Sequence, residues 1–325
     1  MNSGQIVVVS TGGTIASTSE AGGAVPTRSG AQLVEAAHDH TTHIDRIRTH
    51  EVYAVDSSAV TVAQLDLLRR EITAILRDDP DIDGIVVTHG TDTLEESAML
   101  LDLVHDDPRP VILTGAQRTF DHPDADGPSN LSAALEAVSD PANRGRGVLV
   151  AFGDRLLPAR GIGKVSTTDA DAFGSVNPHL RRPLPRRDAA ELASAGADIV
   201  SLYPAIDAGL LTAVAERGRD RFGSRYGMVL AGTGSGNSHA RVTDVVRELT
   251  AGSVPVVVST RLPFGEVEAV YGGGGGAVDL VAAGAILSPW LRPPQLRILL
   301  MDLLSRGADV AEIAEFIESA SQTTD

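Results

Sequence analysis

Short, continuously apolar segments rich in β-branched residues recur along the chain, and longer stretches with helical periodicity separate them. The segments are QIVVVS, GIVVT, PVILT, GVLVAF, YGMVLAG and VPVVVST, which begin at residues 5, 84, 110, 147, 226 and 254. Strands of a parallel sheet have this composition when helices cover both of its faces. The alternation therefore predicts an α/β fold with a doubly wound, mostly parallel sheet.

The helical stretches carry recognisable start signals. Residues 62–76 are amphipathic, and Leu94–Val104 follows Thr93 and has Glu95 and Glu96 in its first turn. An N-cap hydroxyl and early acidic residues are typical of a helix N-terminus, where unpaired N–H groups carry partial positive charge. Near the C-terminus, residues 294–304 and 310–319 predict two further helices.

The length of 325 residues predicts two domains. A Pro-rich, basic stretch without strand pattern, PHLRRPLPRRDAAELASAGAD, separates the strand-rich regions. We therefore expect a larger N-terminal doubly wound domain over residues 1–180, a linker over 181–196, and a smaller C-terminal α/β domain over 197–325. The five glycines at 272–276 predict a flexible surface loop, because glycine loses much conformational entropy on ordering.

Composition narrows the functional classes. The net charge of −16, from 27 basic and 43 acidic residues, disfavours binding to nucleic acids and anionic membranes. The chain has no cysteine, so it forms no disulfide and has no thiolate ligand or thiol nucleophile. The nine histidines show no HxxxH or HExxH spacing, and we expect no metal and no cofactor. The N-terminal residues lack a signal-peptide pattern, which predicts a cytoplasmic protein.

Two loops at predicted strand ends carry small hydroxyl and carboxylate side chains. In STGGTIAS, Gly12 and Gly13 permit a sharp turn that presents Thr14, and THGTDTLEE presents Thr91 and Asp92. Ligands of open α/β sheets bind beyond the carboxyl ends of the strands. Neither loop matches a nucleotide-binding glycine motif. The structural alternatives are a plain glycine turn and a helix cap, but one cap accounts for only one of the polar side chains.

Lys164 is the only lysine in the chain, and it lies in the Gly- and Thr-rich stretch GIGKVSTTDADAF. A desolvated lysine can lose its proton and act as a base, which arginine cannot do. The position therefore indicates catalysis. The alternative is a solvated lysine on the surface.

The motifs TGGTIAS, THGTDTLEE, GAQR…DGPSNL and GKVSTTDADAF together resemble the bacterial-type L-asparaginase family, which includes asparaginase/glutaminases, over nearly the whole chain. This resemblance implies a homotetramer, a dimer of intimate dimers whose active sites are shared between subunits. It also implies hydrolysis of L-asparagine to L-aspartate and ammonia without metal or cofactor, with room for minor glutaminase activity.

The resemblance also implies roles for individual residues. Thr14 matches the threonine that attacks the side-chain amide of the substrate. Thr91, Asp92 and Lys164 match a second threonine with its aspartate and lysine partners, and either threonine is a candidate to lead the attack. An amide needs a nucleophile, a proton relay and stabilisation of an oxyanion, and hydroxyls, a carboxylate and an amine can supply these.

Substrate-binding roles follow from the same resemblance. Ser57, in AVDSSAV, matches a serine that holds the α-carboxylate of the substrate, and Asp92 would also bind the α-ammonium beside Thr91. Ala116 lies in the loop that contacts the amide being hydrolysed. Asn237, in GSGNS, matches an asparagine contributed by the neighbouring subunit.

One departure from the family concerns a tyrosine relay. The family places a tyrosine in the mobile loop after the first threonine, but residues 16–30 hold none, and Ala24 stands in its place. Tyr271, which precedes the glycine run, and Glu20 are the candidates to replace it. A packing role is the alternative for Tyr271.

Three functions remain open from the sequence. The first is an asparaginase. The second is a related glutamine amidohydrolase, such as an ammonia-releasing amidotransferase subunit. The third is a non-catalytic amino-acid sensor that lost the relay tyrosine. The joint presence of Thr14, Thr91, Asp92 and Lys164 favours an enzyme, because a pure binder has no need of Lys164.

Overall fold

The computed structural model describes residues 4–40, 44–182 and 190–322. The chain divides into two compact units, the first ending at Gly174 and the second beginning at Ser175. Of the linker expected over residues 181–196, residues 183–189 lie outside the described residues. The described part of that linker holds a short 3-10 helix, η6 (Leu192–Ser194), and the start of β11 (Gly196–Ser201).

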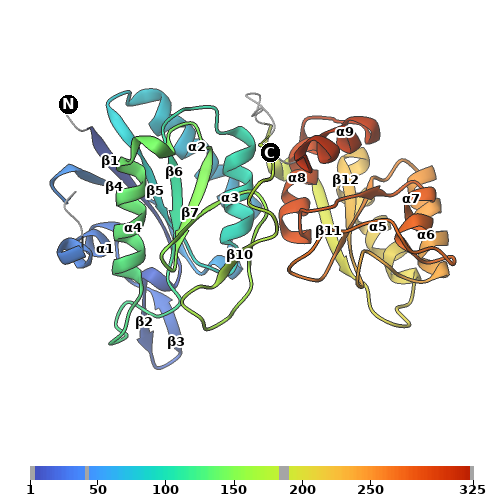
Figure 1. The fold of residues 1–325 in the computed structure, drawn as a ribbon, viewed down its shortest axis with the longest axis horizontal. Helices are drawn as coiled ribbons and strands as arrows, with labels where there is room; N and C mark the ends of the chain where they lie inside the picture. The colour runs from blue at the N-terminus through green and yellow to red at the C-terminus, as the bar shows by residue number, and fades with distance from the viewer. Residues whose placement is uncertain (1–3, 41–43, 183–189, 323–325) are drawn as a thin grey trace. The chain divides into compact units, whose positions relative to one another are not determined.

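The first unit is built on a six-stranded sheet with the order β4-β1-β5-β6-β7-β8 (Figure 1). Neighbouring strands are parallel except β7 and β8, which are antiparallel. This arrangement confirms the mostly parallel sheet. The strands are β1 (Gln5–Gly12), β4 (Ile47–Val55), β5 (Ile82–Thr88), β6 (Val111–Thr114), β7 (Val148–Phe152) and β8 (Arg155–Pro158).

Helices cover both faces of this sheet, as the doubly wound fold requires. Successive residues of a strand point to opposite faces, and in β1 the pair Val7 and Val9 packs in one core while Ile6 and Val8 pack in another. The first core includes α2 (Val62–Asp78) and α3 (Leu94–Val104), and the second includes α1 (Gly30–Ala36) and α4 (Gly127–Ser139).

The second unit is a smaller α/β unit with a four-stranded parallel sheet, β11-β12-β13-β14. The remaining elements are β12 (Tyr226–Gly232), β13 (Val256–Thr260), β14 (Ile286–Leu287), α5 (Gly209–Phe222), α6 (Ala240–Ala251), α7 (Ala277–Ala282), α8 (Pro293–Ser305) and α9 (Val310–Ala320). The two predicted C-terminal helices correspond to α8 and α9. Within the described ranges, no helix is both long enough and apolar enough to cross a membrane.

Several strands were not expected from the sequence. Edge strand β4 has the sequence IRTHEVYAV, whose polar residues face solvent at the rim of the sheet instead of forming an apolar run. A hairpin of β2 (Ser17–Glu20) and β3 (Gly23–Pro26) follows the first glycine loop, and β9 (Ile162–Lys164) pairs with β10 (Phe173–Ser175).

The glycine run is not the wholly flexible loop expected from the sequence. Gly275 and Gly276 are buried, and the N–H groups of Gly274 and Gly276 donate to Asp279 Oδ2 at 2.8 and 2.9 Å. A Cβ on Gly276 would lie 1.8 Å from the carbonyl oxygen of Tyr271. The second half of the run is therefore a packed turn leading into α7, and glycine is needed there for close backbone contact.

Candidate active site

Loops at the carboxyl edge of the first sheet pack directly against one another. A Cβ on Gly13 would lie 2.3 Å from Gly90 Cα, and one on Gly90 would lie 2.6 Å from Ser57 Oγ. Gly13 has φ +80° and its N–H donates to Val55 O at 3.0 Å. Glycine is therefore required where the loops after β1, β4 and β5 meet, because any side chain would force the backbones apart.

Lys164 lies in β9 and bridges two side chains of the loop after β5. Its Nζ donates to Thr91 Oγ1 at 2.8 Å and to Asp92 Oδ1 at 2.7 Å. The Lys164 side chain is 19% exposed, Thr91 is buried, and the Asp92 side chain is 57% exposed. Lys164 is therefore not a solvated surface lysine, and one oxygen of Asp92 remains available on the open side.

The Thr91 hydroxyl also faces Gln117, which sequence reasoning did not assign to the site. Thr91 Oγ1 donates to Gln117 Oε1 across a long 3.4 Å contact. The Gln117 amide is oriented by donation from Nε2 to the carbonyl oxygens of Ser166 and Asp169 at 3.3 and 3.2 Å. Thr91 thus accepts from Lys164 while its own proton points toward Gln117.

Ser57 ties the loop after β4 to the start of α3. Its Oγ accepts from the Asp92 N–H at 3.1 Å, and its carbonyl oxygen accepts from Thr93 Oγ1 at 2.9 Å. Thr93 stands at the N-cap position of α3, but its side chain caps no N–H group there. The capping interpretation of Thr93 is therefore wrong, because its hydroxyl is used to hold Ser57.

Thr14 begins η1 (Thr14–Ala16) directly after Gly13 and is half-buried. The backbones of Gly13 and Gly90 are in contact, and Thr14 and Thr91 are the next residues of their loops. Within the described part of the chain, the Thr14 hydroxyl makes no hydrogen bond. The hydroxyls of Ser57 and Thr91 each accept a hydrogen bond from the protein, whereas that of Thr14 accepts none from the described residues.

His89 supports the loop from behind and does not face a ligand. The side chain is fully buried, and burial lowers its pKa, so the ring is neutral. Nδ1 donates to Gly90 O at 2.7 Å, which leaves Nε2 to accept from Ser97 Oγ at 2.9 Å. The histidine of THGTDT therefore fixes the turn that presents Thr91.

Two other expected site residues of the first unit have different surroundings. Ala116 is 1% exposed and packs in the core with Ile15, so only its backbone can face a ligand. Glu20 is exposed at the end of β2, opposite Gly23 in the hairpin. Ala24, which occupies the place of the family's tyrosine, pairs with Ser19 in the same hairpin.

Asn237 and Tyr271 belong to the second unit. Asn237 follows β12, and its Oδ1 accepts from the Ala277 N–H at 3.1 Å, so the side chain amide has a fixed orientation. The Tyr271 side chain is 60% exposed. It is therefore not a buried packing residue within this chain.

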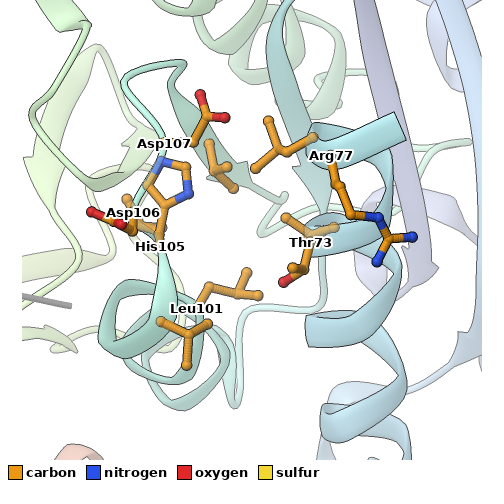
Figure 2. A pocket seen from close by; sticks show the side chains of 11 residues that line it. Thr73, Arg77, Leu101, His105, Asp106 and Asp107 are labelled. Carbon is orange, nitrogen blue, oxygen red and sulfur yellow. The ribbon is translucent and has the colours of Figure 1, made fainter. Parts of the chain in front are cut away.

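A cavity of about 250 Å³ lies at the opposite edge of the first sheet, between α2 and the end of α3 (Figure 2). Aliphatic side chains form its floor, and its polar rim is already paired. His105 Nε2 bonds to Arg109 O, Asp107 pairs with Arg109, and Arg77 pairs with Asp78. The cavity therefore lacks the converging, available polar groups of the loop cluster, and the loop cluster is the better candidate for the active site.

Comparisons with known proteins agree with this geometry. The family model described as Asparaginase, N-terminal matches residues 5–186, and the Glutaminase/Asparaginase C-terminal domain matches residues 197–317. A probable L-asparaginase of Deinococcus radiodurans is 32% identical over 334 residues, covering 95% of both chains. A glutaminase-asparaginase of Pseudomonas aeruginosa is 30% identical over 282 residues, covering 80% of this chain and 76% of the relative.

A solved structure shares the fold. The probable cytoplasmic L-asparaginase of Campylobacter jejuni aligns with a TM-score of 0.80 and 29% identity, covering 97% of this chain and 99% of that one. Both halves of the chain thus match the same family, in sequence and in structure. This chain belongs to the asparaginase family.

Proposed function

We propose that this protein hydrolyses L-asparagine to L-aspartate and ammonia, with minor activity on L-glutamine. The observation that carries the proposal is the bridge from Lys164 Nζ to Thr91 Oγ1 and Asp92 Oδ1, beside the glycine loops that present Thr14. The names of the relatives, L-asparaginase and glutaminase-asparaginase, support this choice of substrates.

With a threonine as the nucleophile, the proposed reaction takes two acyl transfers. The Thr14 oxygen attacks the side-chain carbonyl carbon of asparagine, the C–N bond breaks, and the nitrogen leaves as ammonia with the hydroxyl proton. Water then attacks the resulting ester, which releases aspartate and restores the hydroxyl of Thr14. The free hydroxyl of Thr14 favours it as the nucleophile, whereas Thr91 is engaged with Lys164. The Gly13 and Asp92 N–H groups already donate to Val55 O and Ser57 Oγ, so other backbone N–H groups of these loops are the candidates to hold the oxyanion.

The substrate is a zwitterion, and the loop cluster offers one partner for each charge. The Asp92 side chain is 57% exposed, and Lys164 binds its Oδ1, so Oδ2 can accept from the α-ammonium group. Ser57 Oγ accepts from the Asp92 N–H, so its own proton is free to be donated to the α-carboxylate. The two binding groups are held together by the same hydrogen bond, which fixes the spacing between them.

Ammonia release from purified protein tests the proposal, with L-asparagine, L-glutamine and D-asparagine compared at equal concentration. We expect L-asparagine to be the best substrate. Faster release from glutamine would identify the related glutamine amidohydrolase instead. Binding of L-asparagine without any ammonia release would identify a sensor.

We further propose a homotetramer, a dimer of intimate dimers, in which Asn237 completes the site of a neighbouring subunit. A mixture of two inactive variants, Thr14→Ala and Asn237→Ala, tests the sharing. After the chains are exchanged, a site that draws Thr14 and Asn237 from different subunits is intact in about a quarter of cases, so activity should recover to that fraction. No recovery, or a fully active monomer in sedimentation, would contradict the shared site.

A cytoplasmic location is proposed as well. It rests on the similarity to the Campylobacter jejuni protein, which is named as probably cytoplasmic.

A further inference from the structure

Glu95 connects the start of α3 to the strand that carries Lys164. Its Oε2 accepts a hydrogen bond from the backbone N–H of Lys164 at 2.5 Å. A Cβ on the neighbouring Gly163 would lie 3.4 Å from the same oxygen, an ordinary van der Waals distance, so Glu95 also packs against the residue before Lys164. A carboxylate oxygen therefore holds the backbone of Lys164 directly.

This contact matters because β9 does not belong to the sheet that carries the other site loops, although its Ile162 is buried in the core. It is three residues long and pairs with β10 in a separate two-stranded sheet, outside the six-stranded sheet that carries the loops. Glu95 lies three residues after Asp92, so one short segment provides both side-chain partners of Lys164 and the acceptor of its backbone N–H. The segment can thus set where Nζ stands relative to Thr91.

Glu95 is half-buried, and its carboxyl group faces the backbone of β9. Desolvation by burial raises its pKa to about 7, and the charge of Glu96 acts in the same direction. The N–H bond from Lys164 and the Lys164 charge oppose this rise. Glu95 therefore changes charge near neutral pH while it holds the residue that bridges Thr91 and Asp92.

We propose that Glu95 is a positioning residue that holds the backbone of Lys164 so that Nζ reaches both Thr91 and Asp92. The inference rests on the proposed function for its kinetic consequence. Its structural part, the placement of Lys164, does not depend on the reaction.

Glu95→Ala and Glu95→Gln provide the kinetic test, with Glu51→Ala as the matched control. Glu51 Oε1 likewise accepts a backbone N–H, that of Gly30, at 2.5 Å, but lies outside the loop cluster. A misplaced catalytic group can cost about 100-fold, so we expect Glu95→Ala to lower kcat by that order with KM changed less than about threefold. Glu95→Gln keeps an acceptor oxygen and should restore the rate that the wild type has below pH 7.

The dependence of kcat on pH provides a second measurement, which a general loosening of the fold would not change. An ionised carboxylate accepts a hydrogen bond more strongly than a neutral group. The wild-type kcat should therefore rise as pH increases through about 7, where Glu95 ionises. Glu95→Gln should match the wild type below this pH and lack the rise above it. A rise of equal size in Glu95→Gln would assign the ionisation to another group.

Amine labelling gives a test that needs no activity. Lys164 is the only lysine, so acylation of that peptide by an amine-reactive ester, followed by mass spectrometry, reports on Lys164 alone. We expect faster labelling in Glu95→Ala than in the wild type or in Glu51→Ala. Unchanged labelling together with wild-type kcat in Glu95→Ala would overturn the proposal. Faster labelling in a protein that releases no ammonia would support the placement of Lys164 and count against the proposed function.

Discussion

Lys164→Met is expected to abolish turnover of L-asparagine while leaving the protein folded. Methionine keeps an unbranched side chain but removes the donors to Thr91 Oγ1 and Asp92 Oδ1. Loss of one member of a catalytic relay commonly costs on the order of 1,000-fold or more in kcat. The Asp92 side chain is 57% exposed, so water can replace its lost partner and the fold should lose little stability.

Arg48→Met is a suitable control for this experiment. Arg48 also forms an ion pair, with Asp79 at 2.7 Å, in the same unit and with both side chains partly exposed. We expect its loss to leave kcat close to wild type. Circular dichroism and thermal melting should show both variants folded. A Lys164→Met protein with undiminished kcat would remove the lysine from the mechanism.

The sequence was sufficient for the parts of the site that depend on local pattern. Continuous apolar strands ending in Gly-rich loops placed Thr14 and Thr91 at one edge of the sheet, and the packing of Gly13 against Gly90 agrees with that placement. The single lysine indicated chemistry, and Lys164 does contact the loop. These features are visible in a sequence because each lies within a few residues of a strand end.

Contacts between distant segments could not be read in the same way. Gln117 and Glu95 stood in quoted motifs, but their contacts with Thr91 and Lys164 span 26 and 69 residues. Nothing local distinguishes Glu95 from Glu96 as the one that meets β9. Thr93 looked like a helix cap for the same reason, since its partner Ser57 lies 36 residues earlier.

For the fold as well, features with a local sequence pattern were predicted, and features that depend on tertiary contacts were missed. Strands buried on both faces were recognised, whereas edge strand β4 was missed because an edge strand does not need an apolar run. The glycine run was expected to be flexible from its entropy, but Asp279 and the close approach of Tyr271 O order its second half. Tertiary contacts therefore reversed an expectation that was reasonable for an isolated segment.

The proton acceptor for the nucleophile can be identified by two conservative variants. Tyr271→Phe removes only a hydroxyl from an exposed ring, and Glu20→Gln removes only a charge at the end of the hairpin. We expect Tyr271→Phe to lower kcat if the phenol of a neighbouring subunit takes the place of the missing relay. Wild-type kcat in Tyr271→Phe would exclude that residue. If both variants keep the wild-type kcat, Lys164, Thr91 and Asp92 activate the nucleophile without help from either side chain.

Thr14→Ala is expected to reduce kcat on the order of 1,000-fold or more, because it removes the attacking oxygen. Its hydroxyl makes no hydrogen bond within the described residues, so the fold should be unaffected and L-aspartate should still bind through Ser57 and Asp92. Thr14→Ser keeps the oxygen and should recover much of the rate.

Thr91→Val should also turn over slowly, since Lys164 loses a partner. If Thr14 makes the first attack on the substrate, rapid quenching of Thr91→Val should trap an ester on the Thr14 peptide, detectable by mass spectrometry. An ester on the Thr91 peptide of the Thr14→Ala protein would reverse the two roles.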